Sequence, residues 1–423
     1  MNNSVSQELL KFLQKSPTAF HAVQQMKSEL LAVDFTELKE NQRWNIECGK
    51  HYFVTRNDSS LIAFTIPENG IDKMHILTSH SDSPTFKIKE NPEIEVEKHY
   101  VKLNVEKYGG MLCSPWFDRP LSVAGRVIIK DKTNGQFTSK LVNIDRDLVM
   151  IPNLAIHMNR EINSGYNYNA QKDLLPLYGC GSPKGTFMEQ IAEAAGIEKD
   201  EILGHDLFLY NRQEGSICAS EEFISSGRLD DLQCAFASLQ GFLSGEKRDC
   251  MAVHCVLDNE EVGSGTKQGA ASTFLFDTLI RVHEALGYDG EDYRVHLADS
   301  FMISADNAHA VHPNYTEKAD PTNRPYLNEG IVLKFNANQK YCTDAVSAAM
   351  FRDLCKRADV PVQTFTNRSD MAGGSTLGNI SNTQVALNTV DIGLPQLAMH
   401  SPYETAGVKD TEYLVRAAKE FFC

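Results

Sequence analysis

The sequence predicts an α/β protein built on a mixed or parallel sheet flanked by helices, with a β-rich domain inserted into it. Two observations support this fold class. After about residue 220, helical segments and apolar strand segments alternate along the chain, which is typical of a sheet covered by helices. Between residues 91 and 221, short runs of alternating or β-branched residues are separated by turn residues, which is typical of a β-rich domain.

The expected elements follow in order along the chain. About 30 residues at the start carry apolar side chains at helical spacing on either side of Ser16-Pro17, which predicts two short amphipathic helices. Apolar or β-branched runs predict strands at residues 51–55, 61–65, 74–79, 94–97, 101–105, 121–129, 251–257 and 301–305. Helical spacing predicts helices at residues 232–243 and 274–286.

The domain organisation follows from length and from the two changes in pattern. A chain of 423 residues is longer than one compact core usually supports, so we expect two domains. The inserted domain is expected at residues 91–221. The main domain is then formed by residues 1–90 and 222–423.

Composition excludes several classes of function. The 41 basic and 56 acidic residues give a net charge of −15, which argues against a nucleic-acid or anionic-membrane surface. No run approaches the roughly 18 apolar residues of a membrane span, and the start lacks the pattern of a signal peptide. We therefore expect a cytoplasmic protein, whose ten scattered cysteines stay reduced.

Side chains that can bind metal follow several of the expected strands. In open α/β sheets ligands bind beyond the carboxyl ends of the strands, so these positions are where a site is expected. Five segments supply such residues, namely His80 and Asp82, Asp230 and Asp231, Glu260 and Glu261, Asp306, and His400.

The residue types in this set favour a pair of divalent cations. Two imidazoles with several carboxylates and no thiolate suit Zn²⁺, with Mn²⁺ or Co²⁺ as alternatives. One carboxylate can bridge two cations about 3.5–4 Å apart, which activates a shared water and polarises a substrate carbonyl. Glu260 and Glu261 can then divide the work, one binding metal and the other holding the proton of the water. Each signal also has an ordinary interpretation, such as a solvated glutamate pair or a helix cap, and only their combination favours a site.

At these residues the chain resembles the aspartyl aminopeptidase family of di-zinc metallopeptidases. The resemblance covers nearly the whole chain, through Thr78-Ser-His-Ser-Asp-Ser-Pro84, Ile151-Pro-Asn-Leu-Ala-Ile-His157, Ser226-Gly-Arg-Leu-Asp230, Asn259-Glu-Glu-Val-Gly-Ser264, Ser304-Ala-Asp-Asn-Ala-His-Ala-Val-His-Pro-Asn-Tyr315 and Pro395-Gln-Leu-Ala-Met-His400. It implies a mixed-sheet di-zinc exopeptidase domain with helices on both faces, interrupted by a β-rich dimerisation domain. It also implies an enzyme that hydrolyses the N-terminal residue from peptide substrates.

The resemblance further implies a role for each matching residue. The implied metal ligands are His80, Asp230, Glu261, Asp306 and His400. Asp230 would bridge the two ions, and Glu260 would be the general base that takes a proton from the bridging water. Asp82 would orient the imidazole ring of His80, which leaves Asp231 as a helix cap.

The same resemblance implies an assembly and a substrate pocket. Family members form tetrahedral dodecamers built from dimers, in which a histidine of the insertion reaches a neighbouring active site, and His157 matches that histidine. Lys334 matches a position in the specificity pocket of members that remove acidic residues, so a preference for acidic over neutral residues is expected. Gly374 and Ser375 are candidate substrate contacts, with an ordinary glycine turn as the alternative. The stretch Ser401-Pro-Tyr-Glu404 departs from the family pattern.

Other functions stay open or are excluded. A carboxypeptidase or deacylase on the same di-metal scaffold is one alternative, and a non-catalytic assembly or cargo-binding protein is another. His283-Glu284-Ala-Leu-Gly287 lacks the second histidine of a zincin helix, and Gly263-Ser-Gly-Thr-Lys-Gln-Gly269 does not match a phosphate-binding loop. No Gly-x-Ser-x-Gly elbow occurs, so a serine hydrolase is excluded.

Overall fold

The computed structural model describes residues 4–181, 184–245 and 249–423, and the chain divides into two compact units. Unit 1 comprises Met1–Asp82, Gly215–Met399 and Glu404–Cys423, and unit 2 comprises Ser83–Glu214 and His400–Tyr403. Sequence analysis placed the boundaries at 91 and 221. At the first boundary, the strand Thr85–Val96 runs across residue 91. At the second boundary, the strands that follow residue 214 pair with strands of unit 1.

Unit 1 is built on a mixed sheet, as expected for its fold class. Among the described residues this sheet has nine strands in the order β1-β2-β3-β13-β4-β14-β18-β16-β17. The central strands β13, β4, β14 and β18 run parallel. Strand β3 is antiparallel to both of its neighbours, whereas β16 is antiparallel to β18 and parallel to β17. The strand bounds in sheet order are Thr36–Leu38, His51–Arg56, Ser60–Thr65, Met251–Leu257, Met74–His80, Phe301–Ala305, Asn388–Gly393, Ile331–Phe335 and Val362–Thr366.

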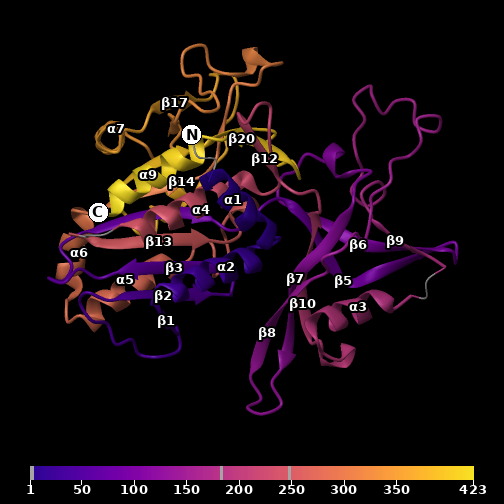
Figure 1. Cartoon of the computed structure of the whole chain (residues 1–423), viewed down its shortest axis with the longest axis horizontal. Coiled ribbons are helices and arrows are strands. Elements are labelled where there is room, and N and C mark those ends of the chain that lie inside the picture. The colour runs from indigo at the N-terminus through magenta and orange to yellow at the C-terminus, as the bar shows by residue number, and fades with distance from the viewer. Residues whose placement is uncertain (1–3, 182–183, 246–248) are drawn as a thin grey trace. The chain divides into compact units, whose positions relative to one another are not determined.

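Helices cover both faces of this sheet (Figure 1). Alternate residues of β13 enter different cores, with Ala252 and Val256 on one face and Val253 and Cys255 on the other. The first core includes residues of α1 (Ser4–Lys15), α2 (Ala19–Ala32), α4 (Leu229–Ser244), α7 (Ala345–Arg357) and α9 (Asp410–Phe422). The second includes residues of α5 (Phe274–Ala285), α6 (Gly290–Ala298) and α8 (Leu377–Ser381). Because both faces are covered, the strands are apolar along nearly their whole length.

A smaller sheet completes unit 1. Its strand order is β11-β12-β20-β19-β15, with bounds Ser216–Cys218, Phe223–Ser226, Glu404–Gly407, Pro395–Leu397 and Ala308–His309. Short 3₁₀ helices lie at Glu260–Val262 and Thr316–Lys318. None of the helices in the described part of the chain is long and apolar enough to cross a membrane.

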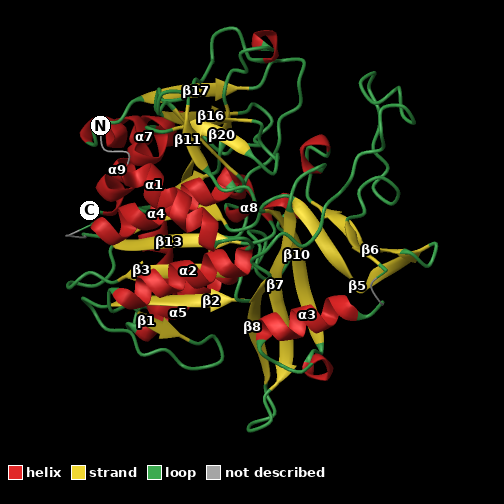
Figure 2. Cartoon of the chain, turned by 45° about the vertical axis from the view of Figure 1, so that its right-hand side comes forward, coloured by secondary structure: helices red, strands yellow, loops and turns green. Residues whose placement is uncertain are grey.

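In the described part of unit 2, an antiparallel sheet packs against one α-helix (Figure 2). The six strands run in the order β8-β7-β10-β5-β6-β9, with bounds Phe137–Asn143, Leu121–Lys130, Gly204–Asn211, Thr85–Val96, Tyr100–Tyr108 and Leu177–Cys180. Helix α3 (Thr186–Ala195) buries Phe187 and Ile191 against this sheet, and 3₁₀ turns lie at Ser114–Trp116 and Lys199–Glu201. Sequence analysis missed α3, although Phe187 and Ile191 lie four residues apart as helical packing requires.

The strand and helix expectations for unit 1 agree with these elements. The break at Ser16-Pro17 falls between α1 and α2. The strand expected at residues 74–79 is β4, which continues for one further residue to His80. That extra residue matters because it places the first candidate metal ligand at the end of a buried strand.

Candidate metal centre

Three parallel strands bring the first candidate residues to one edge of the main sheet. In β4, His80 lies opposite Leu257 of β13, and Thr78 lies opposite Ser304 of β14. The carboxyl ends of these strands therefore lie side by side, as expected for a ligand site in an α/β sheet. His80 and the segments that follow Leu257 and Ser304 are brought together at this edge.

The start of α4 supplies two further carboxylates. Asp230 and Asp231 have non-helical backbone angles, and a cis peptide bond joins them. Asp231 is fully buried, and its Oδ2 accepts a hydrogen bond of 3.0 Å from the backbone N–H of His80. The expected role of Asp231 as a helix cap is therefore not observed, because its carboxylate faces β4.

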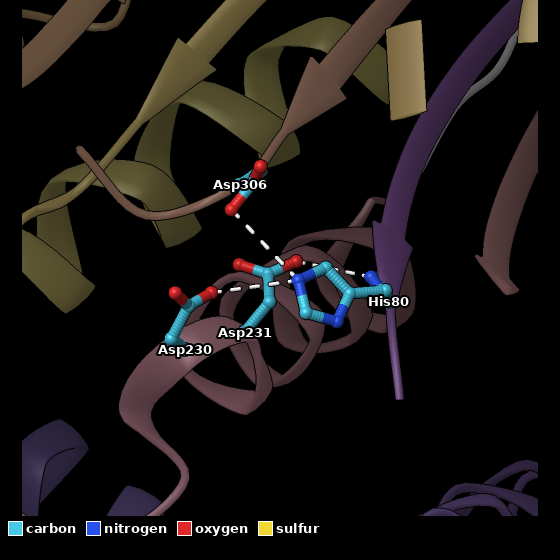
Figure 3. Close-up of side chains that lie close together, drawn as sticks. All are labelled: His80, Asp230, Asp231 and Asp306. Carbon is cyan, nitrogen blue, oxygen red and sulfur yellow. Dashed lines mark hydrogen bonds and ion pairs between the residues drawn. The ribbon is translucent and has the colours of Figure 1, made fainter. Parts of the chain in front are cut away.

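The side chain of His80 is surrounded by carboxylates (Figure 3). Its Nε2 lies 3.4 Å from Asp230 Oδ1 and 3.8 Å from Asp306 Oδ1. Its Nδ1 lies 3.4 Å from Asp82 Oδ1 and 3.1 Å from the carbonyl oxygen of Asp82. The ring is 1% exposed, so these contacts take place away from bulk water.

Asp82 also orders the loop after β13. Its Oδ1 accepts the backbone N–H of Glu260 at 3.1 Å, and its Oδ2 accepts the N–H of Glu261 at 3.2 Å. One carboxylate thus contacts the His80 ring and both glutamates. The residue that sequence analysis assigned to orienting His80 lies at a point where it fixes three candidate site residues at once.

Burial and mutual repulsion dominate the electrostatics of the cluster. Burial raises the pKa of Asp231 well above its usual range. The charge of His80 lowers this pKa, and the charges of Asp306 and Asp230 raise it. Burial and the charge of Asp230 likewise raise the pKa of Glu261. Burial, opposed by His80 and reinforced by Asp306, raises the pKa of Glu260 to about 8. The buried carboxylates of the cluster carry more negative charge than His80 and Lys334 can neutralise.

Two other groups respond to that excess of negative charge. Burial opposes protonation of His80, but Asp231 and its neighbours raise the pKa of the ring well above its usual value. Burial also opposes ionisation of Asp306, yet Lys334 and then His80 lower its pKa to about 2. Cations therefore stabilise the ionised carboxylates wherever they are available.

The donor set fits divalent metal ions. His80, Asp230, Asp231 and Asp306 place ligand atoms within 4.8 Å of one another, and His80, Glu260 and Glu261 form a second such group. Imidazole nitrogen and carboxylate oxygen are the ligands that zinc accepts in catalytic sites. Divalent cations here would also offset the repulsion that raises the pKa values of Asp231 and Glu261.

A network of buried polar side chains is hydrogen-bonded to the backbone of Asp230, and the sequence did not predict it. The backbone N–H of Asp230 donates to Glu404 Oε2 at 3.2 Å, and Glu404 Oε1 accepts from Gln396 Nε2 at 3.4 Å. The amide of Asn307 donates to Gln396 Oε1 at 3.3 Å and to Gln233 Oε1 at 2.9 Å. The motif Ser401-Pro-Tyr-Glu404 was the only signal in the sequence that pointed to Glu404.

Lys334 lies on the other side of Asp306. It is 3% exposed, and its Nζ lies 3.7 Å from Asp306 Oδ2 and donates to the carbonyl oxygen of Asn307 at 2.8 Å. The ring centroid of Tyr341 is 5.5 Å from the ammonium. The lysine therefore neutralises a candidate metal ligand in addition to any contact it makes with a substrate.

The remaining predicted site residues are Gly374, Ser375, His157 and His400. Gly374 and Ser375 are exposed at the turn before α8, where the Ser375 hydroxyl donates to Asn379 at 2.8 Å. His157 is exposed in a loop of unit 2. His400 follows β19 by three residues and is grouped with unit 2, where its carbonyl oxygen accepts from Leu112 at 3.1 Å.

Comparisons with known proteins agree with this donor set. Residues 12–422 match the family model described as aminopeptidase I zinc metalloprotease (M18). A probable M18 family aminopeptidase 2 of Clostridium novyi (strain NT) is 49% identical over 431 residues, covering 100% of both chains.

Solved structures extend the similarity to the fold. The chain in the cryo-EM structure of the Ape4 and Nbr1 complex has a TM-score of 0.94 and 36% identity, with 99% of this chain and 85% of that chain covered. The S. cerevisiae mApe1 dodecamer has a TM-score of 0.87 and 28% identity, with 99% of this chain and 96% of that chain covered. Both matches span the two units described above.

Proposed function

The chain belongs to the M18 family of zinc aminopeptidases, and from this premise we propose that its cluster of buried carboxylates around His80 hydrolyses the first peptide bond of peptides with a free N-terminus. The observation that carries the proposal is the convergence of three side chains at the carboxyl edge of the sheet, where His80 Nε2 lies 3.4 Å from Asp230 and 3.8 Å from Asp306. In this proposal Asp230, Glu261 and His400 would hold two zinc ions together with His80 and Asp306.

The chemistry divides between the metals and the chain. Two zinc ions held by these residues would polarise the scissile carbonyl and make the attacking water more acidic. The chain holds the ligands in place: Asp82 accepts the N–H groups of Glu260 and Glu261 and contacts the His80 ring, so these side chains do not have to be ordered during the reaction.

Glu260 is the proposed general base. It takes a proton from the attacking water and passes it to the nitrogen of the leaving amine, so that the C–N bond breaks as the amine becomes neutral. Burial raises the pKa of Glu260 to about 8, and the charge of two bound cations would lower it again. A base is most effective when its pKa lies near the working pH.

The variant Glu260→Gln tests this assignment. It should keep zinc content and melting temperature near the parental values and lower kcat by several orders of magnitude, roughly 10³-fold, since only the proton carrier changes. Zinc is measured by elemental analysis, and kcat with unblocked and N-acetylated aminoacyl p-nitroanilides. Glu8→Gln, on the exposed face of α1, is the matched control.

Each outcome separates the proposal from its rivals. Parental kcat in Glu260→Gln would remove the base assignment. Equal hydrolysis of N-acetylated and unblocked substrates would instead favour a deacylase or carboxypeptidase on the same scaffold. No hydrolysis of either class by the zinc-loaded parent would favour an assembly or cargo-binding role.

A preference for acidic N-terminal residues is the finer proposal. An ammonium has three donors, and those of Lys334 reach the Asn307 carbonyl oxygen and the Asp306 carboxylate, which leaves one for a substrate carboxylate. Lys334→Met should lower kcat/KM for aspartyl and glutamyl substrates more than for leucyl ones. An equal loss for all substrates would limit Lys334 to supporting Asp306.

We also propose that the insertion mediates self-association and that His157 serves the active site of a neighbouring copy. The mApe1 neighbour was solved as a dodecamer. Beside His157 in the same loop, Ile156 is 48% exposed and Met158 is 70% exposed, which is apolar surface of the kind that interfaces cover. Native mass spectrometry gives the assembly size. Mixing His157→Ala with Glu260→Gln protein should restore part of the activity if the histidine acts between copies, and no recovery in confirmed mixed oligomers would refute this role.

A further inference from the structure

Asp391 is a buried carboxylate that the proposed chemistry does not use. It lies on β18, is fully buried, and pairs in register with Ser304 of β14, two residues before the metal ligand candidate Asp306. Burying a carboxylate is costly unless hydrogen bonds replace its hydration. The partners of Asp391 therefore show what the fold gains from it.

Two chain segments converge on this carboxylate. Asp391 Oδ2 accepts hydrogen bonds from the backbone N–H of Cys342 at 2.6 Å and from its thiol at 2.9 Å. Asp391 Oδ1 accepts from the hydroxyl of Thr376 at 2.7 Å. The backbone N–H of Asp391 donates in turn to Thr343 Oγ1 at 2.8 Å. Asp391 thus bonds Cys342 and Thr376 through its side chain and Thr343 through its backbone, which joins two separate segments of the chain.

The approach of α8 depends on the same carboxylate. A Cβ added at Gly378 would lie 2.4 Å from Asp391 Oδ1, a distance that real Cβ atoms do not reach. Glycine is therefore required where α8 passes Asp391. The absence of a side chain at Gly378 leaves Thr376 close enough to bond the carboxylate.

Both held segments lie next to candidate substrate contacts. Tyr341, the residue before Cys342, has its ring centroid 5.5 Å from the Lys334 ammonium. Gly374 and Ser375 immediately precede Thr376.

We propose that Asp391 is a positioning residue for substrate selection, which holds residues 341–343 and the 373–376 turn beside Lys334 and so determines which N-terminal side chain is accepted. This inference rests on the proposed aminopeptidase function and extends it. Asp391 itself contacts neither the metal ligands nor the substrate in this account. It acts through the two segments that it joins.

Variants of nearly unchanged shape distinguish the contact of Asp391 with Thr376 from its contact with Cys342. Thr376→Val removes the hydroxyl that reaches Asp391 Oδ1 and keeps the volume, whereas Thr376→Ser keeps the hydroxyl and is the matched control. Asp391→Asn is the conservative variant, because its oxygen can still accept from Cys342 while its amide donates to the Thr376 hydroxyl. Asp391→Ala removes both contacts.

The experiment uses the full-length, zinc-loaded protein. KM and kcat are measured with unblocked aspartyl, glutamyl, leucyl and alanyl p-nitroanilides, together with zinc content and melting temperature. Thr376→Val removes one hydrogen bond to a charged group, and a loss of this size should raise KM about tenfold for the substrate that the parent prefers. Its kcat should change less than about twofold, since the proton carrier is untouched. Thr376→Ser and Asp391→Asn should stay near parental, and Asp391→Ala should lose selectivity among the four substrates.

Calorimetric binding of aspartate hydroxamate and leucine hydroxamate provides a second readout that needs no turnover. The ratio of the two Kd values should shift in Thr376→Val and return in Thr376→Ser. A parental ratio and parental KM values in Thr376→Val would overturn the proposal. So would an equal fall in kcat for all substrates with loss of zinc, which would make Asp391 a support of the metal site. If the parent hydrolyses no substrate but the ratio of Kd values still differs between the parent and Thr376→Val, the peptidase function would be refuted and the role of Asp391 in binding would be retained.

Discussion

Asp82→Asn tests how far the site depends on one carboxylate that binds no metal in our proposal. The two oxygens of Asp82 accept from the N–H groups of Glu260 and Glu261, and Oδ1 lies 3.4 Å from the His80 ring. Asparagine has almost the same shape but only one accepting oxygen. Its amide group must therefore face one of the two backbone N–H donors, which replaces a hydrogen bond by a donor facing a donor.

The magnitude follows from that one lost contact. Asp82 is 4% exposed, so water does not replace the missing acceptor. A hydrogen bond to a charged group contributes about 1.5–3 kcal/mol, and 1.4 kcal/mol corresponds to a factor of ten. Zinc affinity should therefore fall about 10- to 100-fold, the range seen when groups that support metal ligands are removed.

The assay is zinc competition with a chromophoric chelator, combined with kcat at saturating zinc. Asp359→Asn, at a carboxylate whose side chain is 98% exposed, controls for the loss of one negative charge. Parental zinc affinity in Asp82→Asn would refute the reasoning. It would show that His80 and the Glu260 loop keep their places without this carboxylate.

Three further predictions concern stability. Burial lowers the pKa of His254 to about 3, below the value of about 6.5 in the unfolded chain, so the unfolded state binds more protons between these pH values. The stabilisation from this group is complete above pH 6.5 and is lost as pH falls toward 3, by about 1.4 kcal/mol per pH unit. The free energy of unfolding, measured with urea at pH 7, 6 and 5, should therefore decline less steeply in His254→Gln than in the parent. Gly125→Ala should destabilise unit 2 by about 1–3 kcal/mol, because a Cβ at this φ of +152° would lie 1.9 Å from the Asp206 carbonyl oxygen; Gly204→Ala, where a Cβ meets nothing within 4 Å, is the control by calorimetry. Chelation of zinc should lower the melting temperature, since a ligand present at 1,000 times its Kd stabilises the folded state by about 4 kcal/mol, and an unchanged melting temperature would contradict a metal bound within the core of unit 1.

The sequence allowed the site to be predicted where chemistry follows a local pattern. His80 is the last residue of one buried strand and Asp306 directly follows another, and the carboxyl ends of parallel strands must meet at one edge. The α/β class was predictable for the same reason, because alternating helices and apolar strands leave few arrangements that bury both faces of the sheet. The assignment of roles to Glu260 and Glu261 required the family resemblance, since both are glutamates on one short turn.

The contacts that support the site were not predictable from the sequence. Glu404 reaches Asp230 across 174 residues of chain, and Asp391 reaches Cys342 across 49, so neither pair leaves a local pattern. An isolated glutamate or aspartate is usually a solvated side chain, and only the three-dimensional structure shows that these two are buried. The predicted boundary at residue 91 differs from the start of unit 2 at Ser83 for a related reason, because strand propensity does not show which sheet a strand joins.

The charge of the cluster bears on the choice between an aminopeptidase and a carboxypeptidase. The buried or half-buried carboxylates that contact one another or the Asp230 backbone are Asp82, Asp230, Asp231, Glu260, Glu261, Asp306 and Glu404. When two divalent cations are bound, these carboxylates are ionised and His80 is neutral, so the formal charge with Lys334 is −7 + 1 + 4 = −2.

A site that stays negative after it binds two metals attracts the ammonium of a free N-terminus and repels a C-terminal carboxylate. This balance favours the aminopeptidase on electrostatic grounds that do not depend on motifs. It also means that an acidic side chain at the first position enters against the net charge, so any preference for aspartate or glutamate must come from a short contact such as that with Lys334. The effect of Lys334→Met on acidic substrates should therefore persist at 0.5 M salt, because a short buried contact is screened far less than the long-range field.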